Sequence, residues 1–133
     1  MSANDTQVGG KHYRTGVQHW DFVAANRLPY FEAQISRYVA RHAKKNGAED
    51  LRKAYHYTKK LTELYEERVV GVFYPERIAI SPAMFCQENG LAVDEKIIIE
   101  ICCGWKHNSD LSVISSRIEK IITEKYGEKP DLF

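Results

Sequence analysis

Apolar side chains recur at helical spacing over two adjacent stretches, which together predict an antiparallel helical hairpin. In the first, roughly residues 29–45, one face at a period of 3.6 carries Phe31, Ile35, Tyr38, Val39 and His42. In the second, roughly 49–68, the apolar stripe consists of Leu51, Ala54, Tyr57, Leu61, Leu64 and Tyr65. The "KKNG" between them predicts a helix end, with Gly47 as a left-handed cap. Glu49 and Asp50 suit the positive dipole end of the helix that follows.

A shorter helix is expected before this hairpin. The segment "VQHWDFVAANRL" places Trp20, Val23 and Ala24 at helical spacing, over roughly residues 17–27. It ends before Pro29, because the residue that precedes a proline disfavours the helical region. We expect Trp20 to pack onto the core.

The second half has less decisive patterns. Ser81 and Pro82 indicate the start of a short helix that stops at Gly90, and 110–126 is amphipathic and ends at Gly127. Residues 96–103 are apolar nearly all round, so they fit either a buried helix, capped by Asp94, or a core strand. The stretch from 69 to 80 leaves open one short strand pair. We therefore expect a mainly α fold, a small helical domain built on the antiparallel hairpin, and we see no internal repeat.

Length and composition fit one soluble domain with a modest core. The chain has 133 residues, of which 44% are hydrophobic and 28% charged. We expect residues 1–10 to be a flexible lead-in and 11–133 to form a single domain, with halves at 11–68 and 69–133. The net charge of +1 gives no overall field that would favour nucleic acid, and no apolar run is long enough for a membrane span. Any anion site must therefore be a local cluster.

Cysteine and motif patterns narrow the chemistry. The three cysteines, Cys86, Cys102 and Cys103, lie in apolar surroundings, which predicts reduced core thiols rather than disulfides, metal ligands or a catalytic nucleophile. The sequence contains no GxxxxGK[ST], GxSxG, HExxH or CxxC pattern. A P-loop nucleotide site is therefore excluded, and we expect no metal site.

Positive charge nevertheless gathers around the turn of the hairpin. Arg37, Arg41 and Lys44 follow one another at spacings of four and three, with Lys45 beside them. Guanidinium groups grip phosphate oxygens at two points, so such a row can hold a phosphate or a diphosphate. A solvated helix face with ion pairs to Glu49 and Asp50 explains the same pattern. Composition alone gives the two interpretations equal weight.

Two further features carry candidate chemistry. His12 and Tyr13 lie in the irregular stretch "GGKHYRTG", where an aromatic face can stack on a base or simply pack on the core. Glu32 and His42 fall towards the apolar side of their helix. A buried carboxylate needs a partner, either a structural arginine or histidine or a ligand hydroxyl. A core histidine with its hydrogen bonds satisfied is the more frequent case for His42.

The stretch "GGKHY", with "HWDFVAANRL" and "YFEAQISRYVARHAKKNGAEDLRKAYHYTKKL" after it, resembles a small phage-encoded family of unknown function, labelled SaV-like or nucleotide kinase. The resemblance covers roughly residues 9–65. The matching positions are His12, Tyr13, Tyr38, Arg41, Lys45, Asp50, Leu51, Lys53, Ala54 and Tyr57. An asparagine common in the family is replaced by Gln34 or absent. The resemblance implies a nucleotide ligand near Arg41, Lys45 and Lys53, and for some members a nucleoside monophosphate kinase that lacks a P-loop.

Two function classes follow. The leading hypothesis is a phage protein that binds a nucleotide in a basic, aromatic-lined pocket and withholds a cyclic nucleotide or cyclic ADP-ribose immune signal from host effectors, without a cofactor. Its predicted ligand-binding residues are His12, Tyr13, Arg37, Arg41, Lys44, Lys45 and Lys53. The alternative is a kinase that uses ATP and Mg²⁺. A helical DNA mimic is poorly supported by the near-zero net charge.

The expected setting is the cytoplasm of an infected bacterial cell, with no membrane or nucleic-acid partner. We also expect a homo-oligomer, because "IIIEICCGW" and the 110–126 helix carry more apolar surface than one small core can use.

Overall fold

Helices make up the regular structure in the part of the chain that this computed structural model describes, residues 16–73, 75 and 78–130. The six α-helices are α1 His19–Asn26, α2 Tyr30–Arg41, α3 Ala48–Glu66, α4 Pro82–Glu88, α5 Val93–Cys102 and α6 Asn108–Tyr126. A 3₁₀ turn, η3 His42–Lys44, follows α2. No strand occurs among the described residues, so the mainly α prediction is confirmed.

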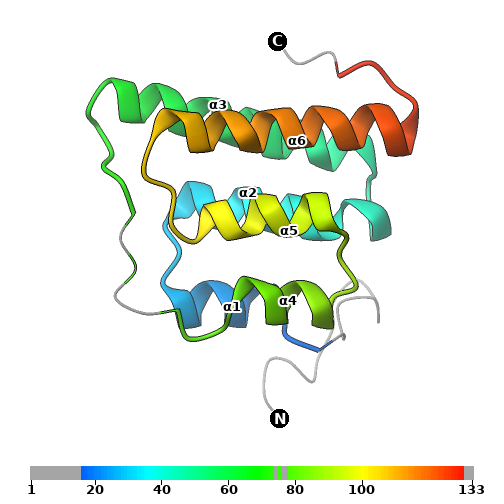
Figure 1. Ribbon diagram of the computed structural model, residues 1–133, viewed down its shortest axis with the longest axis horizontal. Coiled ribbons are helices and arrows are strands. Elements are labelled where there is room, and N and C mark those ends of the chain that lie inside the picture. The colour runs from blue at the N-terminus through cyan, green and yellow to red at the C-terminus, as the bar shows by residue number, and fades with distance from the viewer. Residues whose placement is uncertain (1–15, 74, 76–77, 131–133) are drawn as a thin grey trace.

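The helices are stacked in three layers of two (Figure 1). Helices α3 and α6 form one outer layer, α2 and α5 the middle layer, and α1 and α4 the other outer layer. The apolar core runs between the layers, with Ile35 and Val39 of α2, Ile98 of α5 and Ile114 and Ile118 of α6 all fully buried. Helices α2 and α3 form the predicted hairpin and pack closely on each other.

The hairpin turn differs in detail from the prediction. The α-helical register of α2 ends at Arg41 rather than near residue 45, and η3 tightens the chain before the turn. Gly47 is not the predicted left-handed cap: it is the N-cap of α3, with a φ of 61° and a ψ of −133°, a conformation that glycine adopts readily. Asp50 lies in the first turn of α3, as predicted.

The second half resolves the ambiguous segments as helices. Residues 96–103, which fitted a helix or a strand, lie mainly in α5, and the stretch from 69 to 80 contains no strand in its described residues. Ser81 caps α4 by accepting a hydrogen bond from the backbone N–H of Met84 at 3.1 Å, as predicted. The expectation that Asp94 caps α5 is wrong. Ala92 is the N-cap, and Asp94 pairs instead with Arg117 of α6 at 2.9 Å.

The order of the helices recurs in the two halves, although the sequence has no visible repeat. Each half contains a short, a medium and a long helix in the same order, α1 to α3 and then α4 to α6. Each layer in Figure 1 holds one helix from each half. The sequence hides this relation because few letters are shared between the halves, whereas the order and packing of the helices are retained.

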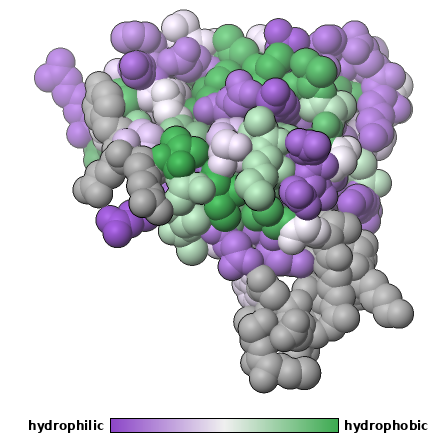
Figure 2. All heavy atoms as spheres, turned by 60° about the horizontal axis from the view of Figure 1, so that its bottom comes forward, coloured by the Kyte–Doolittle hydropathy of each residue, from purple (hydrophilic) through white to green (hydrophobic). Residues whose placement is uncertain are grey.

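Apolar side chains of the second half are mostly satisfied within the chain. Ile98, Ile99, Cys102, Leu111 and Ile114 are all buried, which removes the premise from which we expected a homo-oligomer. Exposed apolar groups remain on the outer layer formed by α1 and α4, where Trp20 of α1 is 53% exposed and Met84 of α4 is 50% exposed. Figure 2, seen from the side of this layer, shows apolar surface with polar groups around it. Packing of Trp20 onto the core was therefore a wrong expectation.

A search of the described helices for a bilayer-spanning segment is negative: none combines sufficient length with sufficient apolar character.

Candidate functional site

Three cations surround one tyrosine on the outer surface of the hairpin. The ring of Tyr38 has the guanidinium of Arg41 at 4.7 Å, that of Arg37 at 5.3 Å and the ammonium of Lys53 at 5.5 Å from its centroid. Tyr38 and Arg37 come from α2, and Lys53 comes from the facing turn of α3. Cations at these distances are attracted by the negative face of the ring. The tyrosine thus allows three like charges to gather in one place.

Aromatic side chains continue this surface along the hairpin. Tyr57 of α3 lies parallel to Tyr38, with ring centroids 5.9 Å apart and an interplanar angle of 16°. Tyr30, which is 60% exposed, contacts Tyr57 with centroids 6.1 Å apart. A hydrogen bond with Tyr30 raises the pKa of Tyr57 above the ordinary value of a phenol. We call the surface made by Tyr30, Arg37, Tyr38, Lys53 and Tyr57 the Tyr38 face.

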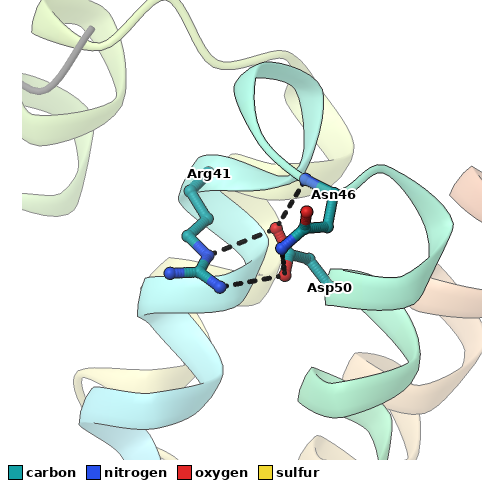
Figure 3. A network of polar contacts seen from close by, with 3 residues as sticks. All are labelled: Arg41, Asn46 and Asp50. Atoms are coloured by element: carbon teal, nitrogen blue, oxygen red, sulfur yellow. Dashed lines mark hydrogen bonds and ion pairs between the residues drawn. The ribbon is translucent and has the colours of Figure 1, made fainter. Parts of the chain in front are cut away.

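Arg41 also has a structural role beneath this face. Its Nε and Nη2 donate to the two carboxylate oxygens of Asp50, each at 3.2 Å (Figure 3). The same carboxylate accepts from the backbone N–H of Asn46 at 3.2 Å, and Asp50 is fully buried. A buried carboxylate needs such partners. Arg41 therefore ties α2 to the start of α3 and places one edge of the Tyr38 face.

The other sequence-predicted cations lie further along the turn. Lys44 ends η3 and Lys45 follows it, both exposed. Because α2 ends at Arg41, the expected helical row from Arg37 to Lys44 does not continue on one face. Lys53 instead joins Arg37 and Arg41 around Tyr38. The predicted residues His12 and Tyr13 lie outside the described residues.

A histidine of the N-terminal stretch, His19, lies near the same helix. His19 Nε2 is 2.8 Å from Ser36 Oγ, and its ring packs edge-on against Phe85 at 5.9 Å. Burial and, secondly, the charge of Arg37 lower the pKa of His19 from 6.5 to about 4. His19 is therefore neutral at physiological pH and can both donate and accept a hydrogen bond.

Glu32 has a partner that differs from the expected arginine or histidine. The indole Nε1 of Trp105 donates to Glu32 Oε2 at 2.9 Å, and both side chains are buried. Burial raises the pKa of Glu32, while the indole hydrogen bond opposes that rise. The carboxyl therefore joins α2 to the segment after α5.

His42 is a core histidine with both ring nitrogens satisfied, as predicted. Its Nε2 lies 2.9 Å from Glu95 Oε1 and its Nδ1 lies 2.7 Å from the Tyr126 hydroxyl. The hydrogen bond from His42 lowers the pKa of Glu95, and burial raises the pKa of Tyr126. This network joins α5 and α6 to the hairpin turn.

The cysteines are buried thiols, as predicted for core residues. Cys86, Cys102 and Cys103 form no disulfide, and burial raises the pKa of each of them. A thiol with a raised pKa is a poor nucleophile at neutral pH. Within the described ranges, no cluster of three or more histidine, cysteine, aspartate or glutamate side chains is arranged to hold a metal ion.

Sequence reasoning missed the aromatic part of the Tyr38 face. Tyr57 was assigned to the apolar stripe of its helix, and Tyr30 was not considered. The available signal was the pairing of tyrosines at matched positions on both sides of the turn, since helices of a hairpin bring such positions together. The cations were found because charge density is visible without knowing the fold.

Comparison with known proteins identifies one domain. Residues 8–59 match the model of a family described as "Protein of unknown function (DUF3310)". The matched span includes α1, α2 and most of α3, and therefore the whole Tyr38 face. No curated protein and no solved structure matches the chain.

Proposed function

We propose that the Tyr38 face binds a nucleotide-type ligand, with phosphate oxygens on Arg37 and Lys53 and a base against the exposed tyrosines. The observation that carries this proposal is the group of three cations around Tyr38, with Tyr57 stacked beside it. Guanidinium and ammonium groups bind phosphate, and a tyrosine ring stacks on any base. These two kinds of contact are the ones a nucleotide requires.

The geometry favours binding of a nucleotide without catalysis over kinase activity. A kinase needs a carboxylate that presents Mg²⁺ to the phosphates. In the described part of the chain, the carboxylate hydrogen-bonded to a cation of this group is that of Asp50, and its oxygens accept from Arg41 and Asn46 inside the protein. We therefore propose sequestration of a nucleotide signal, of the cyclic nucleotide or cyclic ADP-ribose type, in a phage-infected cell. Nucleoside monophosphate kinase activity, which the family resemblance suggests, is the alternative.

The ligand released from the protein distinguishes these two functions. The purified protein is incubated with nucleoside monophosphates plus ATP and Mg²⁺, and separately with cyclic di- and trinucleotides and cyclic ADP-ribose isomers. It is then denatured by heat and the released molecules are analysed. We expect one ligand to be returned intact, with a nanomolar Kd, corresponding to about −12 kcal/mol. Formation of diphosphates with turnover would contradict sequestration and support the kinase.

Exposed Arg37 and half-buried Lys53 provide the site-specific test. Arg37→Ala and Lys53→Ala should each weaken binding of the retained ligand by about 1.5–3 kcal/mol, as expected for the loss of a charge-assisted contact. Lys120→Ala is the matched control, because Lys120 is an exposed lysine on α6 that pairs with Asp94. Titration calorimetry would measure all three. Equal affinity for the Arg37 and Lys120 variants would place the ligand away from the Tyr38 face.

A further inference from the structure

Contacts between the two halves of the chain are reciprocal: where a residue of the first half contacts the second half, the equivalent residue of the second half makes the same contact with the first. Phe85 lies 63 positions after Phe22, and the two rings stack on each other with centroids 4.4 Å apart and an interplanar angle of 16°. Asn89 lies 63 positions after Asn26, and Ile80 lies 63 positions after Val17. Asn26 Nδ2 donates to the Ile80 carbonyl at 2.7 Å, and Asn89 Nδ2 donates to the Val17 carbonyl at 2.9 Å. Such reciprocity is the property of a contact across a two-fold axis.

The buried carboxylates obey the same rule. Glu95 lies 63 positions after Glu32, and Trp105 lies 63 positions after His42. Glu32 pairs with Trp105, and Glu95 pairs with His42, each at 2.9 Å. Both rings are contacted by a tyrosine near the end of the long helix of a half, Tyr65 for Trp105 and Tyr126 for His42. A buried glutamate paired with a ring nitrogen thus occurs in both halves, with Trp105 as the partner of Glu32 and His42 as the partner of Glu95.

The turn before the long helix is three residues shorter in the second half. Asp50 and Leu51 therefore correspond to Asp110 and Leu111, which lie 60 positions later. Asp110 accepts from the backbone N–H of Lys106 at 2.8 Å, as Asp50 does from that of Asn46 at 3.2 Å. The correspondence thus extends through all three helices of each half.

The counterpart of the Tyr38 face has lost its ligand groups. At the equivalent positions Glu100 replaces Arg37, Ile101 replaces Tyr38, Gly104 replaces Arg41 and Val113 replaces Lys53. Glu100, Gly104 and Val113 are exposed, so the replacements are not required by the core. A side chain at Gly104 would meet nothing within 4 Å of its Cβ.

We propose that the chain is a pair of copies of one three-helix unit, in which the second copy completes the fold and has given up its anion site. One ligand therefore binds per chain, on the first half only. The number of sites rests on the proposed function, whereas the reciprocal contacts do not. The match of the family model to residues 8–59 supports this division, because it covers the copy that keeps the cations.

Restoring the four groups in the full chain tests the proposal. The variant carries Glu100→Arg, Ile101→Tyr, Gly104→Arg and Val113→Lys, and the probes are ATP and inorganic pyrophosphate in titration calorimetry. We expect one site per chain in the native protein and two in the variant, the second being the weaker because Val93 and Arg117 stand there in place of Tyr30 and Tyr57. Circular dichroism would check that the helices are kept. Since Ile101 is partly buried, a second variant with only Glu100→Arg and Val113→Lys changes exposed positions, and it should gain a weaker second site.

The outcomes separate the two proposals. Two sites in the native protein would overturn the single-site inference and leave nucleotide binding intact. One site in the native protein and still one in both folded variants would overturn the inference alone. No binding of either probe to the native protein would overturn both. The mirror variant Arg37→Glu, Lys53→Val, which makes the first face like the second, should abolish the native site, and an unchanged site there would also overturn the inference.

Discussion

Arg41 and Asp50 form a charge pair that the fold depends on. Asp50 is fully buried and only 16% of the Arg41 side chain is exposed. Removing one partner of a buried pair leaves the other charge without compensation, which costs several kcal/mol. The exposed Arg37, one helical turn away, lies over the Tyr38 ring and serves as the natural comparison.

We therefore expect Arg41→Ala to lower the free energy of unfolding by about 3 kcal/mol. Arg37→Ala should change it by less than about 0.5 kcal/mol, as for most surface substitutions. Urea denaturation followed by circular dichroism measures both. If the two variants were equally stable, the Arg41–Asp50 pair would not be holding the hairpin turn.

His19 should make stability depend on pH in the mildly acidic range. Its pKa is about 4 in the folded protein and 6.5 ordinarily, so the unfolded chain binds a proton that the folded chain refuses. The contribution of His19 is complete above pH 7, falls as the pH drops below 6.5, and is lost by about pH 4. The difference in pKa corresponds to about 3 kcal/mol.

We expect the free energy of unfolding to decline between pH 7 and pH 4, and His19→Gln to flatten that decline. His56→Gln, at an exposed position of α3, is the control and should leave the slope unchanged. Glu95, whose pKa is lowered by His42, adds its own loss only as the pH falls below its ordinary value of 4.5. A slope that is the same in native protein and in His19→Gln would show that His19 is accessible to protons in the folded state.

At the scale of elements, the hairpin turn depends on Gly47. Its φ of 61° lies in the region that side chains rarely adopt, and an added Cβ would come 3.2 Å from the ring of Tyr126. Gly71, in the connection between the halves, has no atom within 4 Å of such a Cβ. The two glycines thus differ in both backbone conformation and space.

Gly47→Ala should destabilise the protein by about 1–2 kcal/mol, because the substitution strains the backbone and crowds Tyr126. Gly71→Ala should be neutral or slightly stabilising, because it only restricts the unfolded chain. Thermal unfolding of the two variants beside the native protein would measure the contrast. Similar melting temperatures for both variants would mean that the turn can relax without cost.

Periodicity was sufficient to locate helices and insufficient to say what joins them. The stripes around Leu51 and Ile118 have a clear period, so their helices were predicted to within a few residues. Residues 96–103 are apolar except for the exposed pair Lys96 and Glu100, because α5 packs on α2, α4 and α6. Two polar positions are too few to reveal a helical period. Glu32 and Trp105 are 73 residues apart, so their pairing depends on tertiary packing that no local rule contains.

At the scale of the whole molecule, contacts between the helices hold the two halves together. The halves meet through the packing of α2 on α5, of α3 on α6 and of Phe22 on Phe85. The chain at Gly71 is exposed. The covalent link therefore serves mainly to keep two mutually buried surfaces together.

Cutting the folded protein at a protease site inserted beside Gly71 should leave one particle of about the native mass of 15.3 kDa. The two fragments should elute together from a sizing column with an unchanged circular dichroism spectrum, and they should separate only in denaturant. A native protein without the inserted site, treated with the same protease, is the control. Separation of the fragments in native buffer would mean that the contacts between the halves are weak.

Homo-oligomer formation stays a prediction, and it now rests on the exposed apolar side chains of α1 and α4. The apolar segments from which it was inferred are buried within one chain, whereas Trp20 and Met84 remain exposed. If copies associate, we expect them to do so through the outer layer formed by α1 and α4, which faces the viewer in Figure 2. Light scattering of the native protein and of a Trp20→Ser, Met84→Ser variant would decide this, since an oligomer of unchanged size in the variant would exclude that surface.

The reciprocal contacts between the halves also have a consequence for folding at high concentration. The first half of one chain can meet the second half of another and form the same Phe22–Phe85 stack and the same Glu32–Trp105 and Glu95–His42 pairs, with nothing lost inside each bundle. The chain between residues 67 and 81 then decides whether a molecule closes on itself or exchanges halves with a neighbour. Concentrated refolding should thus yield a domain-swapped dimer, whose share grows with protein concentration and falls when the connection is lengthened with glycine and serine.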